Sequence, residues 1–160
     1  MSASPGRPRL RWRWLQSTSN RTFVAWPLAL LALQALLSGG WPPLNPWALP
    51  LLAWGYLQYR WVGRLRAEQG GGGPGLSVPP LRLVRTGPYG VVRNPMYLGH
   101  LIFFAGLAGL FSGAAWVVLA AHVLWFDRRV RADEARLLEL FGDPYRDYQR
   151  RVSRWLPRLG

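Results

Sequence analysis

No charged residue occurs in two long stretches of the sequence: residues 22–59, TFVAWPLALLALQALLSGGWPPLNPWALPLLAWGYLQY, and residues 94–126, NPMYLGHLIFFAGLAGLFSGAAWVVLAAHVLWF. They are 38 and 33 residues long in a chain of 160 residues that carries a formal net charge of +13. A charge at the centre of a bilayer costs roughly 2.5–3.5 kcal/mol on insertion scales. A soluble basic protein has little reason to segregate its charges so completely, so the pattern predicts an integral membrane protein.

Each uncharged stretch divides at a turn signal, at residues 39–43 in the first and at Ser112-Gly113 in the second. Since a spanning helix needs about 20 apolar residues, we expect four transmembrane helices, at residues 22–38, 46–62, 96–111 and 114–126. The last two are short, so they require tilting, local thinning or extension, and a shallow re-entrant pair is the alternative. The predicted fold class is an all-α polytopic membrane helix bundle, with amphipathic C-terminal helices in the cytoplasm.

The arginines fix the predicted orientation through the positive-inside rule. They cluster before the first helix, between the second and third, and after the fourth, whereas both outer turns are uncharged. Both termini are therefore expected in the cytoplasm. All 20 basic residues are Arg, which is typical of GC-rich bacterial genomes, so we expect the bacterial inner membrane. A cleavable signal peptide is disfavoured because no A-x-A-like site closes the first apolar run.

Composition excludes several kinds of site. The chain has no Cys, so it forms neither disulfides nor thiolate metal sites. A basic chain of this kind could bind nucleic acid, but the segregation of its charges argues for a membrane. His100 and His122 are isolated, so we expect hydrogen-bonded bundle residues and no metal. The glycines at 70–73 lack the Gly-Lys-Ser/Thr of a phosphate-binding loop and are interpreted as part of a linker.

Polar motifs gather at the cytoplasmic ends of the predicted helices. They are Leu83-Val84, Gly87-Pro88-Tyr89, Arg93-Asn94-Pro95-Met96-Tyr97-Leu98-Gly99, Asp133-Glu134 and Phe141-Gly142-Asp143-Pro144-Tyr145-Arg146-Asp147-Tyr148. In this order and spacing, residues 81–157 resemble the integral membrane methyltransferases that include isoprenylcysteine carboxyl methyltransferase and the phospholipid N-methyltransferases. In that family, Leu-Val and Gly-Pro-Tyr precede Arg-His-Pro-x-Tyr-x-Gly, and a helical hairpin, a Glu-Glu pair and Phe-Gly-x-x-Tyr-x-x-Tyr follow.

The resemblance implies methyl transfer from S-adenosylmethionine to a lipid-like or small membrane-associated acceptor, at a carboxyl, amine or thiol group. Membrane lipids and the acceptor are then the partners, with neither nucleic acid nor metal. The implied cofactor-binding residues are Leu83, Val84, Tyr89, Arg93, Asn94, Pro95, Tyr97, Asp133, Glu134, Tyr145 and Tyr148. Arg129 is implied in substrate binding, and no catalytic acid or base is assigned.

Chemistry suggests how such a site would work. The carboxylate pair suits the cofactor's ammonium or ribose hydroxyls, Arg93 and Asn94 suit its carboxylate, and the tyrosines suit adenine or the sulfonium. Asn94 stands where the family has His, and Asp133 replaces the first Glu. An alternative is therefore a non-catalytic membrane binding or assembly protein that retains the fold.

These expectations divide the chain into four parts. Residues 1–21 are a basic N-terminal arm, 22–62 hold two transmembrane helices, 63–80 are a Gly/Pro-rich cytoplasmic linker, and 81–160 are a methyltransferase core. That core comprises the helical hairpin and the C-terminal cofactor-binding helices. We expect a polar helix capped by Gly142, and then another that begins at Asp143-Pro144. This last helix is expected to carry Tyr145, Tyr148, Val152 and Trp155 and to end before Pro157.

Overall fold

The computed structural model of the chain describes residues 14–72, 78–111 and 113–157. Residues 1–13 of the predicted arm and residues 73–77 of the predicted linker lie outside these ranges. Within them all regular elements are helical, and the one β-type pairing is an isolated parallel bridge between Val92 and Ser153. The prediction of an all-α protein is confirmed.

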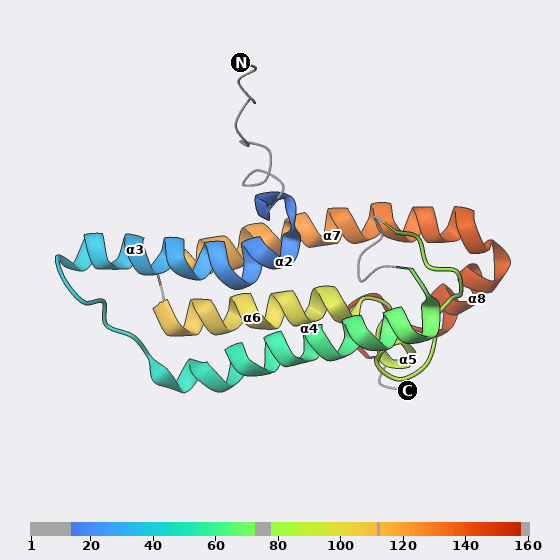
Figure 1. Cartoon of the computed structure of the whole chain (residues 1–160), viewed down its shortest axis with the longest axis horizontal. Helices are drawn as coiled ribbons and strands as arrows, with labels where there is room; N and C mark the ends of the chain where they lie inside the picture. Colours follow the sequence, from blue (N-terminus) through green and yellow to red (C-terminus); the bar gives the residue numbers. More distant parts are fainter. Residues whose placement is uncertain (1–13, 73–77, 112, 158–160) are drawn as a thin grey trace, which may run out of the picture.

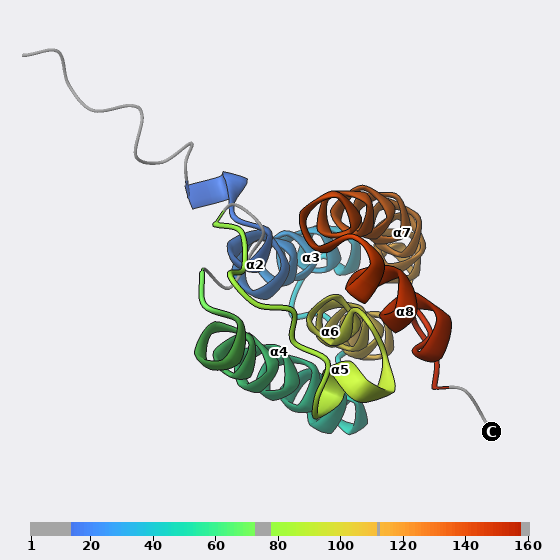
Figure 2. The same ribbon diagram turned by 90° about the vertical axis from the view of Figure 1, so that its right-hand side faces the viewer.

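Four long helices run side by side along the molecule (Figure 1): α3 (Trp26–Ser38), α4 (Leu49–Gly70), α6 (Pro95–Phe111) and α7 (Ala114–Phe141). Seen from the end, α6 lies among the other three, and the short helix α8 (Asp143–Arg151) lies to one side of it, packed against α7 (Figure 2). The most extensive contact is between α6 and α4, followed by that between α6 and α7. The buried core accordingly includes Phe104 and Leu107 of α6 and Phe126 of α7.

The first long helix contains an irregularity that its sequence explains. Helix α2 (Thr18–Asn20), the π-helical turn η1 (Arg21–Ala25) and α3 form one continuous helix. Pro27 lies in its interior, where it has no N–H to donate and clashes with the carbonyl one turn earlier. The π turn directly before it lets the Trp26 N–H bond to the Arg21 carbonyl instead. The helix therefore continues through the proline.

This continuous helix, Thr18–Ser38, is the one described helix that is long and apolar enough to cross a membrane by length and composition. Helix α6 is apolar but has 17 residues. Helices α4 and α7 each combine an apolar half with a charged half, which lowers their mean hydropathy. The four predicted segments are thus helical, while the prediction that all four span a bilayer is not confirmed.

Helices α4 and α6 approach closely through glycine. A Cβ atom added to Gly55 would lie 2.5 Å from the backbone nitrogen of Phe103, and one added to Gly99 would lie 3.0 Å from the Gly55 carbonyl oxygen. Small residues that let two backbones approach in this way are typical of helix pairs in membranes. This contact sets the position of the start of α6, which carries the Arg-Asn-Pro-Met-Tyr motif.

Helix α7 differs from the prediction in its length. The predicted fourth span and the following polar helix are one continuous helix of 28 residues. It ends at Gly142, whose φ of 59° suits glycine and whose N–H bonds to the Leu138 carbonyl at 2.8 Å. Helix α8 begins at Asp143 with Pro144 in its first turn, as predicted. It ends at Arg151, so the prediction that it also carries Val152 and Trp155 is wrong.

Candidate functional site

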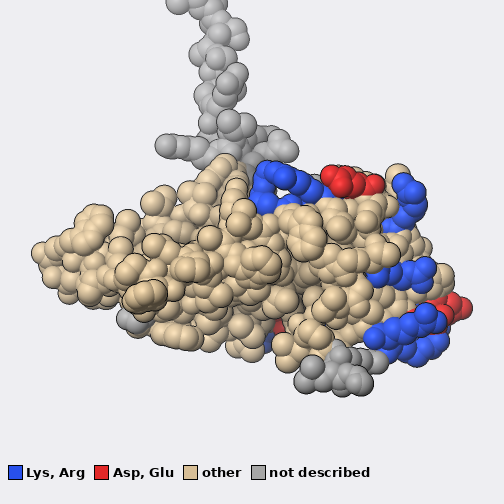
Figure 3. Space-filling model, turned by 90° about the horizontal axis from the view of Figure 1, so that it is seen from below, with Lys and Arg blue, Asp and Glu red and all other residues tan. Residues whose placement is uncertain are grey.

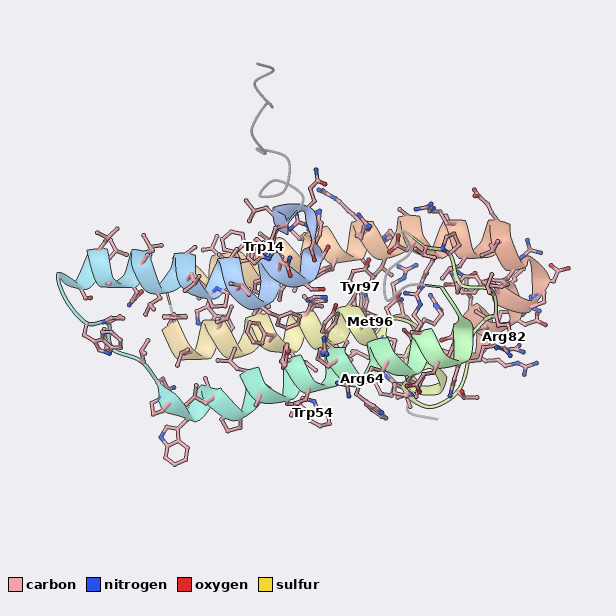
Figure 4. The ribbon with its side chains drawn as sticks, in the orientation of Figure 1. Trp14, Trp54, Arg64, Arg82, Met96 and Tyr97 are labelled. Carbon is pink, nitrogen blue, oxygen red and sulfur yellow. The ribbon has the colours of Figure 1, made fainter. Side chains whose placement is uncertain are left out.

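A cavity of about 430 Å³ lies where the start of α6 and the C-terminal half of α7 meet α4, α8 and the segment before α5 (Pro88–Val91). All the predicted binding residues except Pro95 and Glu134 line its wall: Leu83, Val84, Tyr89, Arg93, Asn94, Tyr97, Arg129, Asp133, Tyr145 and Tyr148. Figure 4 labels three wall residues, with Met96 and Tyr97 near the start of α6 and Arg82 further toward α8. The fold therefore brings together motifs that are distant in the sequence.

Asp133 is the carboxylate of the predicted pair that lines the cavity. The Tyr97 hydroxyl donates a hydrogen bond to its Oδ2 at 2.6 Å, and the Arg129 Nε lies 3.6 Å from its Oδ1, one helical turn away. The Asp133 side chain is 8% exposed, whereas that of Arg129 is half-exposed. Because a carboxylate has about four acceptor positions, Asp133 can still accept bonds from a ligand in the cavity.

Glu134, the second member of the pair, is buried among hydrogen-bond donors and does not line the cavity. It is 3% exposed, and its two oxygens accept bonds from Arg93, Asn94 and Arg154. Burial alone would raise the pKa of Glu134, but the hydrogen bonds from these three side chains outweigh burial and lower the pKa. Glu134 therefore stays ionised and holds its neighbours in place.

Arg93 joins three parts of the chain. Its Nε and Nη2 form a bidentate pair with Glu134 at 3.0 and 3.1 Å, and its Nη1 donates to the carbonyls of Gln149 and Val152 at 3.0 and 2.6 Å. These carbonyls lie at the end of α8, where helical partners are missing. Four of the five guanidinium N–H groups are thus engaged. One N–H of Nη2 has no partner among the described residues and can bind a ligand.

Asn94, which stands where the family has His, uses its side-chain amide as a hydrogen-bond donor. Its Nδ2 donates to Glu134 Oε1 at 2.9 Å. Because a carboxylate can only accept, this contact fixes which end of the amide is nitrogen. The Oδ1 of Asn94 has no hydrogen-bond partner among the described residues and is available as an acceptor.

The end of the cavity next to α8 is aromatic and apolar. We call it the α8 end, and it comprises Leu83, Val84, Tyr89, Tyr145 and Tyr148. The Tyr148 hydroxyl donates to the Tyr89 carbonyl at 2.6 Å, and the rings of Tyr145 and Tyr148 lie 5.8 Å apart. Burial raises the pKa of Tyr89 to about 12 and also raises those of the other two tyrosines. These phenols therefore act as neutral packing and hydrogen-bonding groups.

The opposite end of the cavity was not predicted from the sequence. We call it the α4–α6 end, and it comprises Thr18, Ser19, Tyr59, Met96 and His100. The Ser19 hydroxyl is hydrogen-bonded to that of Tyr59, whose ring lies 4.7 Å from the His100 ring. These residues belong to three helices far apart in the sequence, so no local motif could have grouped them.

His100 differs from the prediction. It is 4% exposed, and its Nδ1 has no hydrogen-bond partner in the described part of the chain. An unsatisfied buried polar group costs about 1–3 kcal/mol. The expectation of a hydrogen-bonded bundle residue is therefore wrong for His100. It holds for His122, whose Nδ1 lies 2.8 Å from the Val118 carbonyl.

Arg154 and Trp155 are further residues that sequence reasoning missed. Arg154 donates to Glu134 through Nε and Nη2 at 3.1 and 2.9 Å, and the Trp155 indole donates to Asp127 at 3.1 Å. Hydrogen bonds from Trp155 and Arg131 lower the pKa of Asp127. These contacts attach the segment after α8 to α7. They depend on the path of the chain after α8, which no local sequence pattern predicts.

Comparisons with known proteins agree with this geometry. Residues 75–143 match the phospholipid methyltransferase family. The chain is 36% identical over 79 residues to a protein-S-isoprenylcysteine O-methyltransferase of Schizosaccharomyces pombe, covering 48% of this chain and 34% of that protein. It is 31% identical over 83 residues to methanethiol S-methyltransferase 1 of Bradyrhizobium diazoefficiens, covering 52% of this chain and 29% of that protein. No solved structure matches the chain.

The match thus spans about a third of the length of these relatives and about half of this chain. Within that half, the resemblance to the membrane methyltransferases of the isoprenylcysteine and phospholipid family is confirmed.

Proposed function

We propose that this protein transfers a methyl group from S-adenosylmethionine to a lipophilic or small acceptor at the cytoplasmic face of a membrane. The observation that carries this proposal is the cavity, whose wall gathers most of the residues implied by the family motifs. The relatives that match this region are named as methyltransferases of isoprenylcysteine or methanethiol. Carboxyl and thiol acceptors are thus both represented, and an amine is the third chemical alternative.

The cavity is suitable for such a cofactor in size and in its polar groups. Its volume of about 430 Å³ is within the usual range of about 300–1,000 Å³ for small-molecule sites. When bound, S-adenosylmethionine supplies a methyl group attached to a positively charged sulfur. We assign adenine to the α8 end, the α-ammonium or ribose hydroxyls to Asp133 and the Asn94 Oδ1, and the carboxylate to the remaining Arg93 N–H. Pro95 and Glu134 then support the site from outside its wall.

Methyl transfer needs alignment of the reacting atoms and exclusion of water more than it needs an enzyme nucleophile. Arg129 lies on the same helical face as Asp133 and is half-exposed, so it can contact an acceptor that approaches from outside the cavity. The wall is otherwise mainly aromatic and aliphatic, which suits an acceptor with an apolar chain.

We further propose that the four long helices cross or enter the bilayer, with both termini in the cytoplasm of a bacterial cell. Large apolar side chains such as Leu36, Trp47, Trp54 and Val117 are exposed on the described surface. Figure 3 supports this orientation, because the charged side chains visible on that face gather toward the end that carries α8. Helix α6 is about 25 Å long at 1.5 Å per residue, so local thinning of the bilayer or extension past its ends is part of the proposal.

Cofactor binding tests the function. Isothermal titration of the purified protein in detergent should give micromolar binding of S-adenosylmethionine. Asp133→Ala should weaken it about tenfold or more, because a hydrogen bond to a charged group contributes about 1.5–3 kcal/mol. Asp143→Ala is the matched control, since that carboxylate is exposed and paired with Arg146 on the surface. No binding by the wild-type protein would reject the proposal.

An assay of methyl transfer distinguishes an enzyme from a non-catalytic protein with the same fold. Membranes that contain the protein are incubated with S-adenosylmethionine labelled in its methyl group, and the labelled products are separated by class. Cofactor binding without transfer to any carboxyl, amine or thiol compound would favour a binding or assembly protein.

The orientation in the membrane is tested separately by introducing single cysteines, which the native chain lacks. Gly40→Cys should react with an impermeant thiol reagent from the periplasm and Arg64→Cys should not.

A further inference from the structure

His100 is a buried polar side chain at the wall of the cavity, and neighbouring rings hold its imidazole in place. It is 4% exposed, and its Nδ1 has no hydrogen-bond partner among the described residues. The rings of Phe23 and Phe126 stack on it at 4.9 and 5.5 Å, with interplanar angles of 23° and 28°. Since buried polar groups in native proteins nearly always have a partner, this geometry indicates that a ligand in the cavity supplies one.

The polar groups of the α4–α6 end are suited to donate hydrogen bonds. The hydroxyls of Ser19 and Tyr59 share one hydrogen bond, which uses one of their two hydrogens. An uncharged imidazole has one N–H to donate, so this role of His100 requires no change of protonation. An oxygen that carries no hydrogen can accept from both sources, because it has two lone pairs. A carbonyl oxygen is such a partner.

The charged groups of the cavity lie at a distance from His100. On α4, Tyr59 and Arg66 both line the cavity, seven residues or about 10 Å apart at 1.5 Å per residue. Asp133 is separated from His100 by Tyr97, whose ring lies 6.4 Å from the His100 ring and whose hydroxyl donates to Asp133. A ligand that fills both regions therefore places its charged or reacting group near Arg66 and Asp133 and an uncharged group near His100.

We propose that the α4–α6 end binds the ester or amide carbonyl of an acyl-chain acceptor, with His100 donating a hydrogen bond to the carbonyl oxygen. This inference rests on the proposed function and does not depend on which group of the acceptor is methylated. His100 lies within the uncharged stretch of residues 94–126, so the acyl chain meets no charged side chain of α6 beyond it. A thioether sulfur is a weak acceptor, so a chain attached only through sulfur would leave His100 unsatisfied.

NMR of the histidine nitrogens tests this contact without relying on activity. The chain has two histidines, so ¹⁵N-histidine labelling gives signals from His100 and an internal control from His122. The full-length protein is studied in dodecyl maltoside, a detergent without a carbonyl group. The probe is 1-monolauroylglycerol, and 1-O-dodecylglycerol is its matched ether. The ester should shift the His100 signals, the ether should shift them much less, and neither should shift those of His122.

Affinities then separate recognition of the carbonyl from packing. His100→Phe keeps an aromatic ring against Phe23 and Phe126 but removes both nitrogens. Scintillation proximity with tritiated probes should show that the wild-type protein binds the ester about three- to tenfold more tightly than the ether, the contribution of one hydrogen bond between neutral groups. This preference should disappear in His100→Phe, whereas a purely structural role would weaken both probes alike. His122→Phe, the matched control, should retain the preference.

The outcomes distinguish this inference from the proposed function. Equal binding of ester and ether by the wild-type protein, binding of neither, or an ester preference that persists in His100→Phe would overturn this inference alone. So would S-adenosylmethionine shifting the His100 signals as much as the ester does, because the cofactor would then be the missing partner. If the wild-type protein does not bind S-adenosylmethionine at all, the proposed function fails and this inference fails with it.

Discussion

Replacement of the buried Arg93 by Ala should destabilise the protein more than replacement of the exposed Arg131 by Ala. The Arg93 side chain is 9% exposed and its partner Glu134 is 3% exposed, so the ion pair is shielded from water. The substitution removes both bonds to Glu134 and both bonds to the carbonyls of Gln149 and Val152. It also leaves a buried carboxylate with two partners, Asn94 and Arg154.

The magnitude follows from the burial of the pair. Removing one partner of a buried ion pair costs about 3–5 kcal/mol, because the other charge stays behind. In a chain of this size each kcal/mol lowers the midpoint of thermal unfolding by about 2–4 °C. Arg93→Ala should therefore lower the midpoint by about 6–20 °C. Arg93→Lys keeps the charge but loses the bidentate geometry, so its effect should be intermediate.

The assay is thermal unfolding in detergent, followed by circular dichroism and by intrinsic Trp fluorescence. Arg131→Ala is the matched control. Arg131 pairs with Asp127 at 2.8 Å, but its side chain is 65% exposed, so the loss should be at most about 1 kcal/mol. Equal midpoints for the Arg93 and Arg131 variants would refute the conclusion that Arg93 holds α8 against the rest of the site.

Three further predictions concern other parts of the molecule. Tyr97→Phe should weaken S-adenosylmethionine binding in calorimetry about two- to tenfold, because one hydrogen bond to the cavity carboxylate is lost; Tyr56→Phe, in an exposed position of α4, should leave it unchanged. Gly55→Ala should lower the unfolding midpoint by several degrees, because its Cβ would meet the α6 backbone, whereas Gly40→Ala has no atom within 4 Å and should have no effect. The folded-state pKa of Glu134 is below its unfolded value of about 4.3, so the stability that it contributes is present above pH 4.3 and is lost as pH falls through the folded-state pKa. Chemical unfolding should therefore show wild type and Glu134→Gln converging in stability below pH 4, and a difference that does not depend on pH would contradict the pKa shift.

The helices of the bundle could be predicted because their signal is local. Two uncharged stretches of 38 and 33 residues are each divided by a turn signal that contains Gly. This local pattern predicted the positions of all four long helices. The cap at Gly142 and the start of α8 also followed from neighbouring residues. The boundary predicted within α7 was wrong because the sequence changes there from apolar to amphipathic, and a helix accommodates both patterns without a break.

The sequence motifs predicted which residues lie close together at the cavity, but not which contacts each side chain makes there. Asp133 and Glu134 are neighbours on one helix, yet Asp133 faces the cavity and Glu134 is buried behind its wall, because successive residues of a helix point about 100° apart. Arg93 was predicted to bind the cofactor, while most of its donors bind residues 41 to 59 positions later. Such contacts depend on how α8 folds back against α7, which no periodicity in the sequence indicates.

The structure also gives a chemical reason why Asn94 is compatible with catalysis. The family's His is replaced by a residue that cannot titrate, but the contact made here requires only an N–H donor to Glu134, which an amide supplies. The substitution would be damaging if this position carried a proton during the reaction. Position 94 serves as a neutral support for Glu134. The departure at Asn94 is therefore compatible with the proposed methyl transfer.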